Sequence, residues 1–454
     1  MHPTEEVLTL SSLPAPFGFG HHPKFERSFR THLEQLRQGN FSHGEVSLSQ
    51  LADSRHPEVF IIPRDRLLYV VDEWGDTIGF EKTILPFSST DFYADRDEEG
   101  GLFCELDHSE AFFRLGGISQ LGYLVPPRPD ELDKSVSISY MVPPFSHTRW
   151  VHSLLVAILM EIILSRNGFS KEERDPVVLT AGSHDIATPA GGDSIKRVDP
   201  KNLHEEEGFA WVLEHHGLAK RWAEQFGFNL SLAKDWVKGR GIFGQLLDVL
   251  DKISYTALDC YQLGRVRPGE VRSLCLKHPL IVDVWQDIQF TPDRANFFFS
   301  RPERLFRFLL LRAYEYQELL FNPYSRALDL FLKKLVQPLY RKGIITKEQL
   351  LTGDDKWLER VLDKYYPEEI KGYIEPEELS WKRFGTAREQ REFAKTLGKR
   401  ADHAERIAGF STGLDWSVLK EGKIVSLRET TTPAKVKLLE RIVASTRGYY
   451  VYYT

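Results

Sequence analysis

The chain has 454 residues, of which 42% are hydrophobic and 27% are charged, and its formal net charge is -6. This balance is typical of a globular protein and excludes a largely disordered chain. The negative charge argues against a protein whose main task is to coat DNA, but it leaves room for a local basic pocket that binds phosphates. Because the length exceeds what one hydrophobic core usually organises, we expect one main domain with extensions.

The cysteines and the apolar segments indicate the cellular compartment in which the protein is expected to reside. The three cysteines, Cys104, Cys260 and Cys275, are widely spaced and form no CxxC pair, so we expect neither a disulfide scaffold nor a cysteine zinc site. The first residues, "MHPTEEVLTLSSLPAPFGFG", lack the basic and then apolar order of a secretory signal. The longest apolar run, "LLVAILMEIIL", is too short to span a bilayer. We therefore expect a cytoplasmic protein without a membrane anchor.

The first predicted elements are an extension and a hairpin. Residues 1–65 mix proline, glycine, histidine and charged residues, which predicts an extension around the core. The stretch that begins at Glu58, "EVFIIPRDRLLYVVDEWGDTIGFEKTIL", alternates β-branched and polar residues around a glycine turn. This alternation predicts a short β-hairpin before the helices begin.

From Ser109 onward the hydrophobic spacing becomes helical, starting with "SEAFFRLGGISQLG". The proline-rich stretch between Gly122 and Ser146 predicts a loop directly before an apolar helix. Further helices are predicted over residues 145–167, 171–183, 203–226, 230–238, 242–263 and 302–341. The middle of the chain is therefore predicted to be an all-helical body.

The tail begins at about Tyr373 and combines a helical stretch with the strand-like segments "GKIVSLRE" and "RGYYVYYT". These segments predict a small α+β appendage. The predicted fold is mainly α. It comprises an N-terminal extension (1–65), a helical core with a short N-terminal β-hairpin (66–341), and a C-terminal helical and α+β appendage (342–454).

An ordered series of possible metal ligands lies on successive predicted helices. His152 is in the first turn of one helix, His184 and Asp185 end the next, and Asp251 lies on a later one. Imidazole nitrogens and carboxylate oxygens on rigid helices are the donor set of a hydrolytic metal site, with open positions for water and a phosphate oxygen. A single histidine is more often a hydrogen-bonded core residue, but the whole series favours a divalent metal ion such as Mg, Mn, Fe, Co, Ni or Zn.

Three segments around this series resemble those of the HD-domain deoxynucleoside triphosphate triphosphohydrolases. "FFRLGGISQLG" resembles the family's "fqRLr.IkQLG", "SHTRWVHSL" resembles "sHnRFeHSL", and "DKISYTALDCYQLG" is similar to "DkwDYfaRDchhLG". The resemblance covers about residues 65–335. It implies an HD-domain helical core whose metal ligands are His152, His184, Asp185 and Asp251. It also implies hydrolysis of deoxynucleoside triphosphates to deoxynucleoside and triphosphate, by a homo-oligomer whose assembly is regulated by nucleotides.

The same resemblance implies a set of substrate contacts. Gln120 takes the 3′-hydroxyl of the sugar, and Leu121 helps to leave no room for a 2′-hydroxyl. Tyr255 packs against the sugar, and Asp259 helps to fix the 3′-hydroxyl. The positions that contact phosphates are Arg149, Lys252 and Arg312.

His204, in "NLHEEEGF", resembles the family histidine that faces the scissile phosphate, and Asp193 is the candidate for its acidic partner. A histidine oriented by a carboxylate is suited to protonate the leaving 5′-oxygen. The alternative is that His204 caps a helix start whose first turn carries three glutamates.

Departures from the family pattern keep other functions open. After Asp185 the chain reads "IATPAGGDS", with Thr188 where the family has a histidine, and Phe321 replaces an aromatic hydroxyl. One alternative is stepwise removal of phosphates from nucleotides or their analogues. Another is a second metal bound by His204 with His215 or His216, as in binuclear HD phosphodiesterases or di-iron oxygenases. A third is a nucleotide-sensing scaffold without activity, and a nucleic-acid partner is not excluded.

Overall fold

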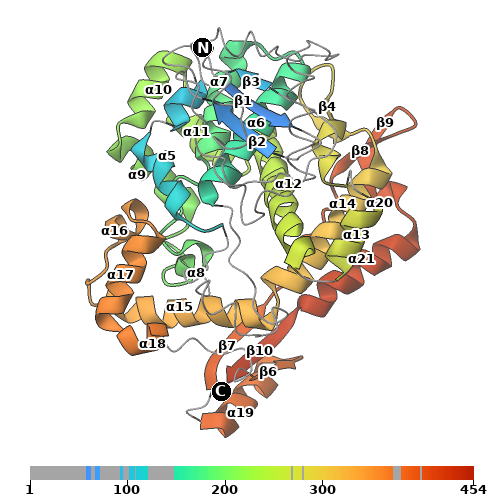
Figure 1. The fold of residues 1–454 in the computed structure, drawn as a ribbon. Coiled ribbons are helices and arrows are strands. Elements are labelled where there is room, and N and C mark those ends of the chain that lie inside the picture. The colour runs from blue at the N-terminus through green and yellow to red at the C-terminus, as the bar shows by residue number, and fades with distance from the viewer. Residues whose placement is uncertain are drawn as a thin grey trace, which may run out of the picture. The chain divides into compact units, whose positions relative to one another are not determined.

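The structure of the protein is a computed structural model that describes residues 58–62, 67–71, 93–95, 102–107, 109–120, 148–266, 269–278, 281–371, 380–398 and 401–453. Figure 1 labels its helices and strands. The chain forms two compact units, and segments of the chain alternate between them. The first unit comprises Met1–Gly116, Ser146–Ile186 and Phe209–Leu258, and the second comprises Gly117–Phe145, Ala187–Gly208 and Asp259–Thr454.

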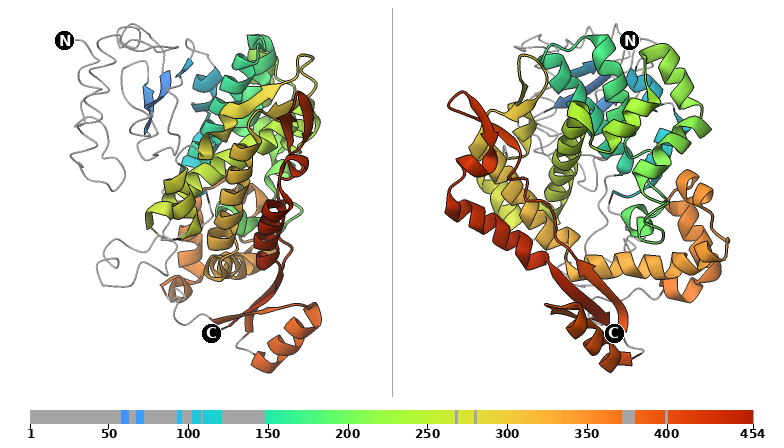
Figure 2. Two further views of the ribbon diagram at one scale, coloured as in Figure 1. Left: turned by 90° about the vertical axis from the view of Figure 1, so that its right-hand side faces the viewer. Right: turned by 180° about the vertical axis from the view of Figure 1, so that it is seen from behind.

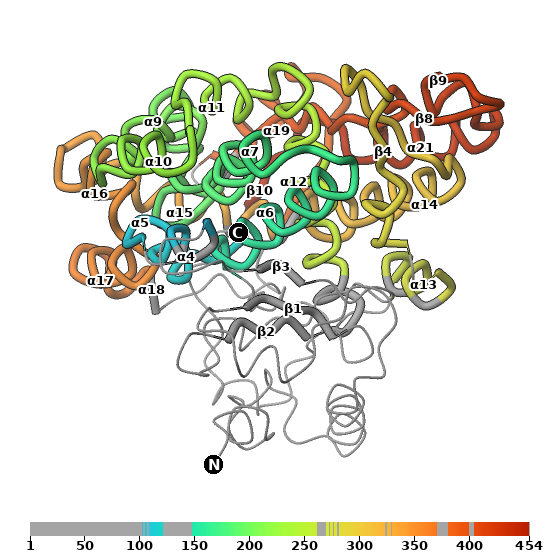
Figure 3. Tube along the Cα trace, turned by 90° about the horizontal axis from the view of Figure 1, so that it is seen from above, coloured from blue at the N-terminus to red at the C-terminus, as the bar shows by residue number. Residues whose placement is uncertain are grey.

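The first unit is built mainly from helices. They are α4 (Leu102–Asp107), α5 (Glu110–Phe113), α6 (Arg149–Arg166), α7 (Lys171–Ser183), most of α9 (Glu205–His215), α10 (Leu218–Phe226), α11 (Leu230–Val237) and most of α12 (Gly241–Val266), with a short 3-10 turn at Arg114–Gly117. Helices α6 and α7 lie side by side as an antiparallel pair joined by a short loop (Figure 3). Most of α6 is buried, which explains why apolar residues occupy all its faces.

Side-chain caps set the starts of this helix pair. The side chain of Thr148 accepts a hydrogen bond from the Val151 amide at the start of α6. Ser170 and Glu173 form a capping box at the start of α7, in which each side chain accepts from the other's backbone amide. These caps satisfy amides that the first helical turn leaves without an intrahelical partner.

Gly182 permits the close approach of α7 to its neighbours. A Cβ atom at this position would lie 2.6 Å from Cδ1 of Leu106 and 3.2 Å from Cβ of Ala157. The first separation is too short for a carbon contact, so a side chain here would force the end of the Leu106 side chain to move. Gly182 lies two residues before His184, so this close packing is next to the end of α7 that carries the HD pair.

A small antiparallel sheet belongs to the first unit. Strand β1 (Glu58–Ile62) pairs with β2 (Leu67–Val71) on one side and with β3 (Tyr93–Asp95) on the other. A hairpin is therefore present in the predicted segment, with β3 as an additional strand, but residues 63–66 between β1 and β2 include no glycine, so the expected glycine turn is not the turn of this hairpin. The predicted domain boundary at residue 65 falls between β1 and β2, and the boundaries at 65 and 341 stay predictions.

The second unit contains the remaining helices and two further sheets. Its helices are α8 (Gly192–Lys196), α13 (Glu270–Lys277), α14 (Pro302–Glu315), α15 (Pro323–Arg341), α16 (Lys347–Thr352), α17 (Asp355–Tyr365), α18 (Pro367–Lys371), α19 (Ala387–Leu397), α20 (Leu427–Thr430) and α21 (Pro433–Thr446), with short helical turns at Ile281–Asp287 and Tyr316–Leu320. Its strands are β4 (Ile288–Phe290), β5 (Phe297–Phe299), β6 (Ser380–Phe384), β7 (Ala401–Ile407), β8 (Ser417–Lys420), β9 (Lys423–Ser426) and β10 (Gly448–Tyr453).

Figure 2 shows α15 running between the helices α16 and α17 and the strands β6, β7 and β10, and a hydrophobic cluster includes residues from each half of this helix. Near its C-terminal end, Leu335 packs with Leu350 of α16 and Leu358 of α17. Near its start, Leu330 packs with Tyr452 of β10. The helix therefore links α16 and α17 to the sheet β6-β10-β7, whose strands are antiparallel.

The other sheet of this unit joins distant segments. Its order is β4-β5-β8-β9, and β5 pairs in parallel with β8 through Phe299 and Val418. The ring of Phe299 also stacks on Trp416, with 5.6 Å between the ring centroids. Strands β9 and β10 confirm the two strand-like segments of the predicted appendage, and β6, β7 and β8 are additional strands of the same tail.

The mainly helical fold is confirmed, but the middle of the chain is not all-helical, because it contains the paired strands β4 and β5, and two predicted helices are interrupted. The predicted helix 203–226 is divided at Gly217, whose φ of 67° is in the left-handed region that glycine adopts readily. The predicted helix 302–341 is divided after the π-helical turn at Tyr316–Leu320, and α15 begins at Pro323, which has no amide hydrogen. Among the described helices, none is both long enough and apolar enough to cross a membrane.

Candidate metal centre

The antiparallel pairing of α6 and α7 brings His152 and His184 together in the first unit. His152 lies in the first turn of α6, and His184 directly follows α7. At about 1.5 Å per residue, α6 carries the chain about 20 Å beyond His152 and α7 carries it back by about 20 Å, so the two histidines come to the same end of the pair. Asp251 comes to this end from the middle of α12. Three residues far apart in the sequence therefore meet at one point.

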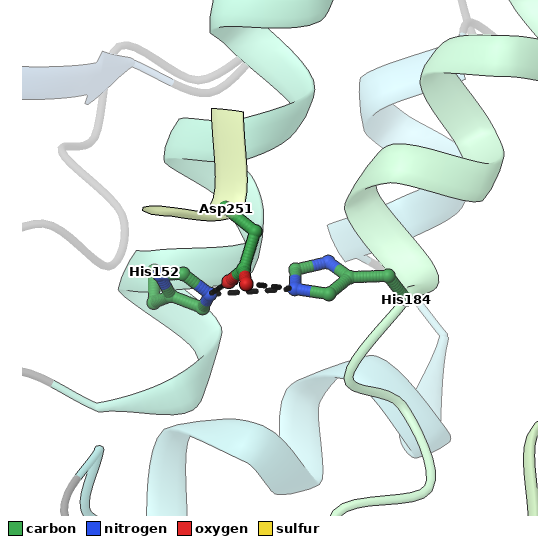
Figure 4. Close-up of side chains that lie close together, drawn as sticks. All are labelled: His152, His184 and Asp251. Atoms are coloured by element: carbon green, nitrogen blue, oxygen red, sulfur yellow. Dashed lines mark hydrogen bonds and ion pairs between the residues drawn. The ribbon is translucent and has the colours of Figure 1, made fainter. Parts of the chain in front are cut away.

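These three side chains, called here the metal group, point toward one another (Figure 4). Nε2 of His152 lies 3.0 Å from Oδ1 of Asp251 and 3.3 Å from Nε2 of His184. Nε2 of His184 lies 3.6 Å from the same Asp251 oxygen. The imidazole of His152 is fully buried, whereas 34% of the Asp251 side chain is exposed. The group is thus held by the core on one side and open on the other.

The separations suit a shared metal ion. Metal–ligand bonds of about 2.1 Å at angles of about 90 to 110° place neighbouring ligand atoms about 3 to 3.5 Å apart. Two of the three separations in the metal group, 3.0 and 3.3 Å, lie in this range, and the third, 3.6 Å, lies just above it. Among the described residues, the metal group is the set of histidine and acidic side chains close enough together to hold a metal ion. Two imidazoles and a carboxylate fit a divalent ion of the first transition row better than Mg²⁺, which prefers oxygen ligands.

The other ring nitrogen of each histidine has a partner of its own. Nδ1 of His184 lies 2.7 Å from the carbonyl oxygen of Ala181, to which it donates a hydrogen bond. Nδ1 of His152 lies 3.0 Å from Oγ of Ser254 on α12. Contacts of this kind orient metal-binding histidines and fix which nitrogen carries the proton. They leave both Nε2 atoms facing Asp251.

Asp185 lies beside the metal group and is bound by an arginine. Its two carboxylate oxygens are each 3.8 Å from one histidine Nε2, Oδ2 from that of His152 and Oδ1 from that of His184. Nη1 of Arg149 donates a hydrogen bond of 2.7 Å to Oδ2. Arg149 precedes His152 by one turn of α6, so one helix start presents a candidate ligand and a positive charge together.

Burial and neighbouring charges act differently on the three ionisable groups of the metal group. Burial lowers the pKa of His152, and Asp251 only partly opposes this effect. Burial also acts to lower the pKa of His184, but Asp185 and then Asp251 outweigh it and raise this pKa to about 9. For Asp251, burial acts upward, yet hydrogen bonds from both histidines hold its pKa well below the usual range. The carboxylate therefore stays ionised, as a metal ligand must.

The remaining predicted substrate contacts of the first unit lie on α12. Lys252 follows Asp251 directly and forms an ion pair with Asp248 one turn earlier. Tyr255, one turn after Asp251, is half-buried. The structure therefore places both residues near Asp251 in the helix, and their contacts with phosphate and sugar stay predictions.

The second unit holds Gln120, Asp259 and Arg312. Gln120 and Asp259 are buried, and no described residue forms a hydrogen bond with Oε1 of Gln120. Arg312 is buried too: Nη1 donates to the carbonyl oxygen of Ser411 (3.0 Å), and the guanidinium lies over the ring of Tyr316 (4.9 Å). The predicted phosphate contact of Arg312 stays a prediction, and Leu121 lies outside the described residues.

The candidate acid His204 lies beside a series of ion pairs in the second unit. Its Nδ1 lies 3.5 Å from Oε2 of Glu205, and the His204 side chain is 44% exposed. Oε2 of Glu205 pairs with Nζ of Lys196 at 2.6 Å, and Lys196 pairs with Asp193 at 2.6 Å. Glu205 is thus the carboxylate next to the His204 ring, whereas Asp193 pairs with Lys196, and the expected role of Asp193 stays a prediction. The backbone carbonyl of His204 accepts the Gly208 amide (3.2 Å), so His204 directly precedes α9 and accepts a hydrogen bond from its first turn.

Two supporting residues were not expected from the sequence. Nη2 of Arg114 donates to the carbonyl oxygen of Ile186 (2.8 Å) and so holds the turn directly after Asp185. Arg114 lies in the segment "FFRLGGISQLG", whose resemblance to the family pointed to a function but did not predict this contact. The sequence did not indicate a role for Ser254, because a serine on a helix is common and its partner, His152, lies on another helix.

No protein-family model matches the sequence, and no curated protein matches it either. Solved structures share the fold. A hypothetical protein from Aquifex aeolicus is 17% identical, with a TM-score of 0.58 over 79% of this chain and 93% of that one. A phosphohydrolase from Bacteroides thetaiotaomicron VPI-5482 is also 17% identical, with a TM-score of 0.56 over 79% of this chain and 97% of that one. Because the identities are this low, the two similarities show a common fold and nothing more.

Proposed function

We propose that the protein is a metal-dependent phosphohydrolase that acts on deoxynucleoside triphosphates and releases deoxynucleoside and triphosphate. The observation that carries the proposal is the convergence of His152, His184 and Asp251 from three helices onto one point. The fold shared with a phosphohydrolase and the resemblance of three segments to HD-domain triphosphohydrolases support it.

A divalent cation bound by the metal group would polarise a phosphate oxygen and lower the pKa of a water molecule toward neutrality. The chain's own residues supply the other requirements. Arg149 lies beside the metal group through its bond to Asp185, and Lys252 is adjacent to Asp251 in the sequence. Both are positively charged, so they suit binding of the polyphosphate and balance its negative charge.

Protonation of the leaving 5′-oxygen is assigned to His204. A phosphate ester leaves poorly as an alkoxide, so an acid within reach accelerates the cleavage. His204 is partly exposed, and its Nδ1 lies 3.5 Å from Oε2 of Glu205, a contact that can orient the ring. This assignment rests on the resemblance of "NLHEEEGF" to the family segment and on this local contact.

Recognition of the deoxyribose is assigned to Gln120, Leu121, Tyr255 and Asp259. The buried Oε1 of Gln120, which no described residue hydrogen-bonds, is available to accept from a sugar hydroxyl. A buried acceptor of this kind is costly unless it finds a donor. The 3′-hydroxyl of a deoxynucleotide is such a donor.

No observation favours a second metal over one. His215 is exposed, and its ring stacks on Trp211 with 4.7 Å between centroids. Burial and the adjacent His215 lower the pKa of His216. Neither residue belongs to the group of possible ligands found among the described residues. Stepwise phosphate removal shares its metal chemistry with the proposed reaction, and the reaction products distinguish the two.

The test is product analysis by mass spectrometry after incubation with all four deoxynucleoside triphosphates and Mn²⁺. We expect intact triphosphate and deoxynucleoside, and no turnover after EDTA treatment. Monophosphate or diphosphate products would instead assign stepwise hydrolysis. Absence of any turnover in a protein that carries its metal would reject the proposed function.

A second arm of the same experiment compares each deoxynucleotide with its ribonucleotide. We expect the deoxy substrate to be favoured by about 5- to 150-fold, because a 2′-hydroxyl would have to displace packed side chains at about 1 to 3 kcal/mol. Equal turnover of dGTP and GTP, and of dATP and ATP, would reject the assigned sugar pocket and leave the metal-dependent reaction standing.

A further inference from the structure

The contact between His152 and Ser254 explains how one histidine is kept ready to bind a cation. Ser254 lies on α12 three residues after Asp251, and it is fully buried. Its Oγ is 3.0 Å from Nδ1 of His152 and 3.4 Å from the backbone carbonyl oxygen of the same residue. Helix α12 therefore supplies one ligand of the metal group and the partner of another ligand's ring.

The two contacts of Ser254 are compatible with a His152 ring that carries its proton on Nδ1, as metal binding through Nε2 requires. A neutral histidine binds a cation through Nε2 only when its ring proton is on Nδ1. The hydroxyl oxygen of Ser254 can accept this Nδ1–H bond while its own hydrogen is donated to the His152 carbonyl. Both donors in this buried contact then have acceptors, which avoids the cost of leaving a buried polar group without a partner.

His184 reaches the same arrangement through a different partner. Its Nδ1 faces the carbonyl oxygen of Ala181, which can accept a hydrogen bond but never donate one. The hydroxyl of Ser254 can do both, so it also pairs with the form of His152 in which Nε2 donates to Asp251. The backbone fixes the ring of His184, whereas the ring of His152 depends on one side chain.

We propose that Ser254 is a positioning residue of the metal centre, which orients the ring of His152 and accepts its Nδ1–H bond when Nε2 binds the cation. The inference rests on the part of the proposed function in which the metal group binds a cation, and it requires no particular substrate. Ser254 acts through His152 alone.

The test compares Mn²⁺ binding by wild-type protein and the Ser254→Ala variant in isothermal titration calorimetry. We expect the variant to bind the same number of ions with a Kd about 10- to 100-fold higher, the usual consequence of losing such a supporting contact. The Ser254→Thr variant keeps a hydroxyl, so we expect it to regain most of the affinity.

The matched control is Ser153→Ala. Ser153 is adjacent to His152 on α6 and is also fully buried, and its Oγ has no hydrogen-bond partner among the described residues. We expect its Kd for Mn²⁺ to equal that of wild type. Absorption bands of bound Co²⁺ provide a second measurement, because they report ligand geometry: they should shift in Ser254→Ala and not in the control.

An unchanged Kd and unchanged Co²⁺ bands in Ser254→Ala overturn this inference and leave the proposed function standing. Wild-type protein that binds neither ion overturns both. If Ser254→Ala does not fold, ¹⁵N spectra of the histidine rings in Zn²⁺-loaded wild-type protein decide the matter. The signals lost on His152→Ala substitution must then come from a ring protonated at Nδ1, and protonation at Nε2 overturns the inference.

Discussion

Each unit buries a group of charges, and the two groups are balanced in different ways. In the first unit, the metal group and Asp185 direct nitrogen lone pairs and carboxylate oxygens toward one point, and Arg149 bonds to one of the two carboxylates. In the second unit, two arginines face two carboxylates in what is called here the charge network, formed by Arg197, Arg326, Asp329 and Glu405.

The contacts of the charge network satisfy its acceptors. Arg326 binds Glu405 through two nitrogens and also reaches Asp329 at 3.4 Å. The hydroxyl of Tyr452 donates to Glu405 (2.8 Å), and that of Ser194 donates to Asp329 (2.7 Å). Because positive and negative groups match within the network, it joins α8, α15 and β7 without needing a ligand.

This difference separates a binding site from a structural ion network. Where acceptors and lone pairs outnumber the buried cations, as in the metal group, an added cation is stabilised. The raised pKa of His184 has the same cause, an excess of negative charge around the group. Asp185 and Asp251 favour a positively charged ring in spite of burial. Where cations and anions are equal in number, removal of one member leaves a buried charge unpaired and destabilises the fold.

The largest expected effect is that of Asp251→Ala. The variant should lose bound Mn²⁺ and at least about 10³-fold in kcat, because the cation supplies several kcal/mol of transition-state stabilisation. Its Tm should change little, since the side chain is partly exposed. Asp248→Ala, on the same helix and 52% exposed, is the control that should retain the metal. Full metal content in Asp251→Ala would contradict the assignment of the metal group as a binding site that differs from the charge network.

The variant His204→Ala tests whether every histidine beside a carboxylate is a ligand. We expect kcat to fall by about 10² to 10⁴, the range for loss of a general acid, with metal content unchanged. The defect should shrink with a p-nitrophenyl phosphate ester, whose leaving group needs no proton. Loss of metal in proportion to activity would make His204 a ligand and favour a binuclear site.

Breaking the charge network should affect stability instead of metal binding. Glu405→Ala leaves Arg326 buried without its main partner, so we expect the free energy of unfolding to fall by about 3 to 5 kcal/mol. Denaturant unfolding measures this change, and the Mn²⁺ content per folded chain should equal that of wild type. Glu392→Ala breaks the exposed pair with Arg388 and should cost about 0.5 kcal/mol or less. Equal losses in both variants would contradict the structural role of the network.

The smallest expected effect is a pH dependence at Asp329. Burial raises its pKa to about 6, although Arg326 opposes this, while the ordinary value is 3.8. The folded state therefore binds this proton more tightly, and the resulting stability is present below about pH 4 and lost as the pH rises through about 6. The Tm of Asp329→Asn should thus increase relative to wild type between pH 4 and pH 7.

Asp199 provides a control of opposite sign. Hydrogen bonds from Asn202 lower the pKa of Asp199, so its contribution to stability is lost as the pH falls. The Tm of Asp199→Asn relative to wild type should therefore decrease as the pH rises from below 4. A Tm difference for Asp329→Asn that stays constant with pH would show that Asp329 is as well compensated as the other members of the network.

The sequence by itself predicted the main helices and four candidate ligands, of which His152, His184 and Asp251 meet in the metal group, whereas the ligand role of Asp185 stays a prediction. The apolar periodicity of α6 and α7 lies within short segments, and the order of His152, the HD pair and Asp251 can be read along the chain. The hairpin at β1 and β2 likewise depends on neighbouring residues. These features are encoded locally, so no knowledge of packing is needed to predict them.

Only the tertiary structure decided which side chains support this group and which form the charge network. Ser254 meets His152 across 102 positions, and Glu405 meets Arg326 across 79. The parallel pairing of β5 with β8 also joins distant segments. The periodicity of a helix fixes the face on which a residue lies but not the element that packs against that face. Such partners follow from the packing of the whole chain, and that is why the sequence predicted neither the contact of Ser254 with His152 nor that of Glu405 with Arg326.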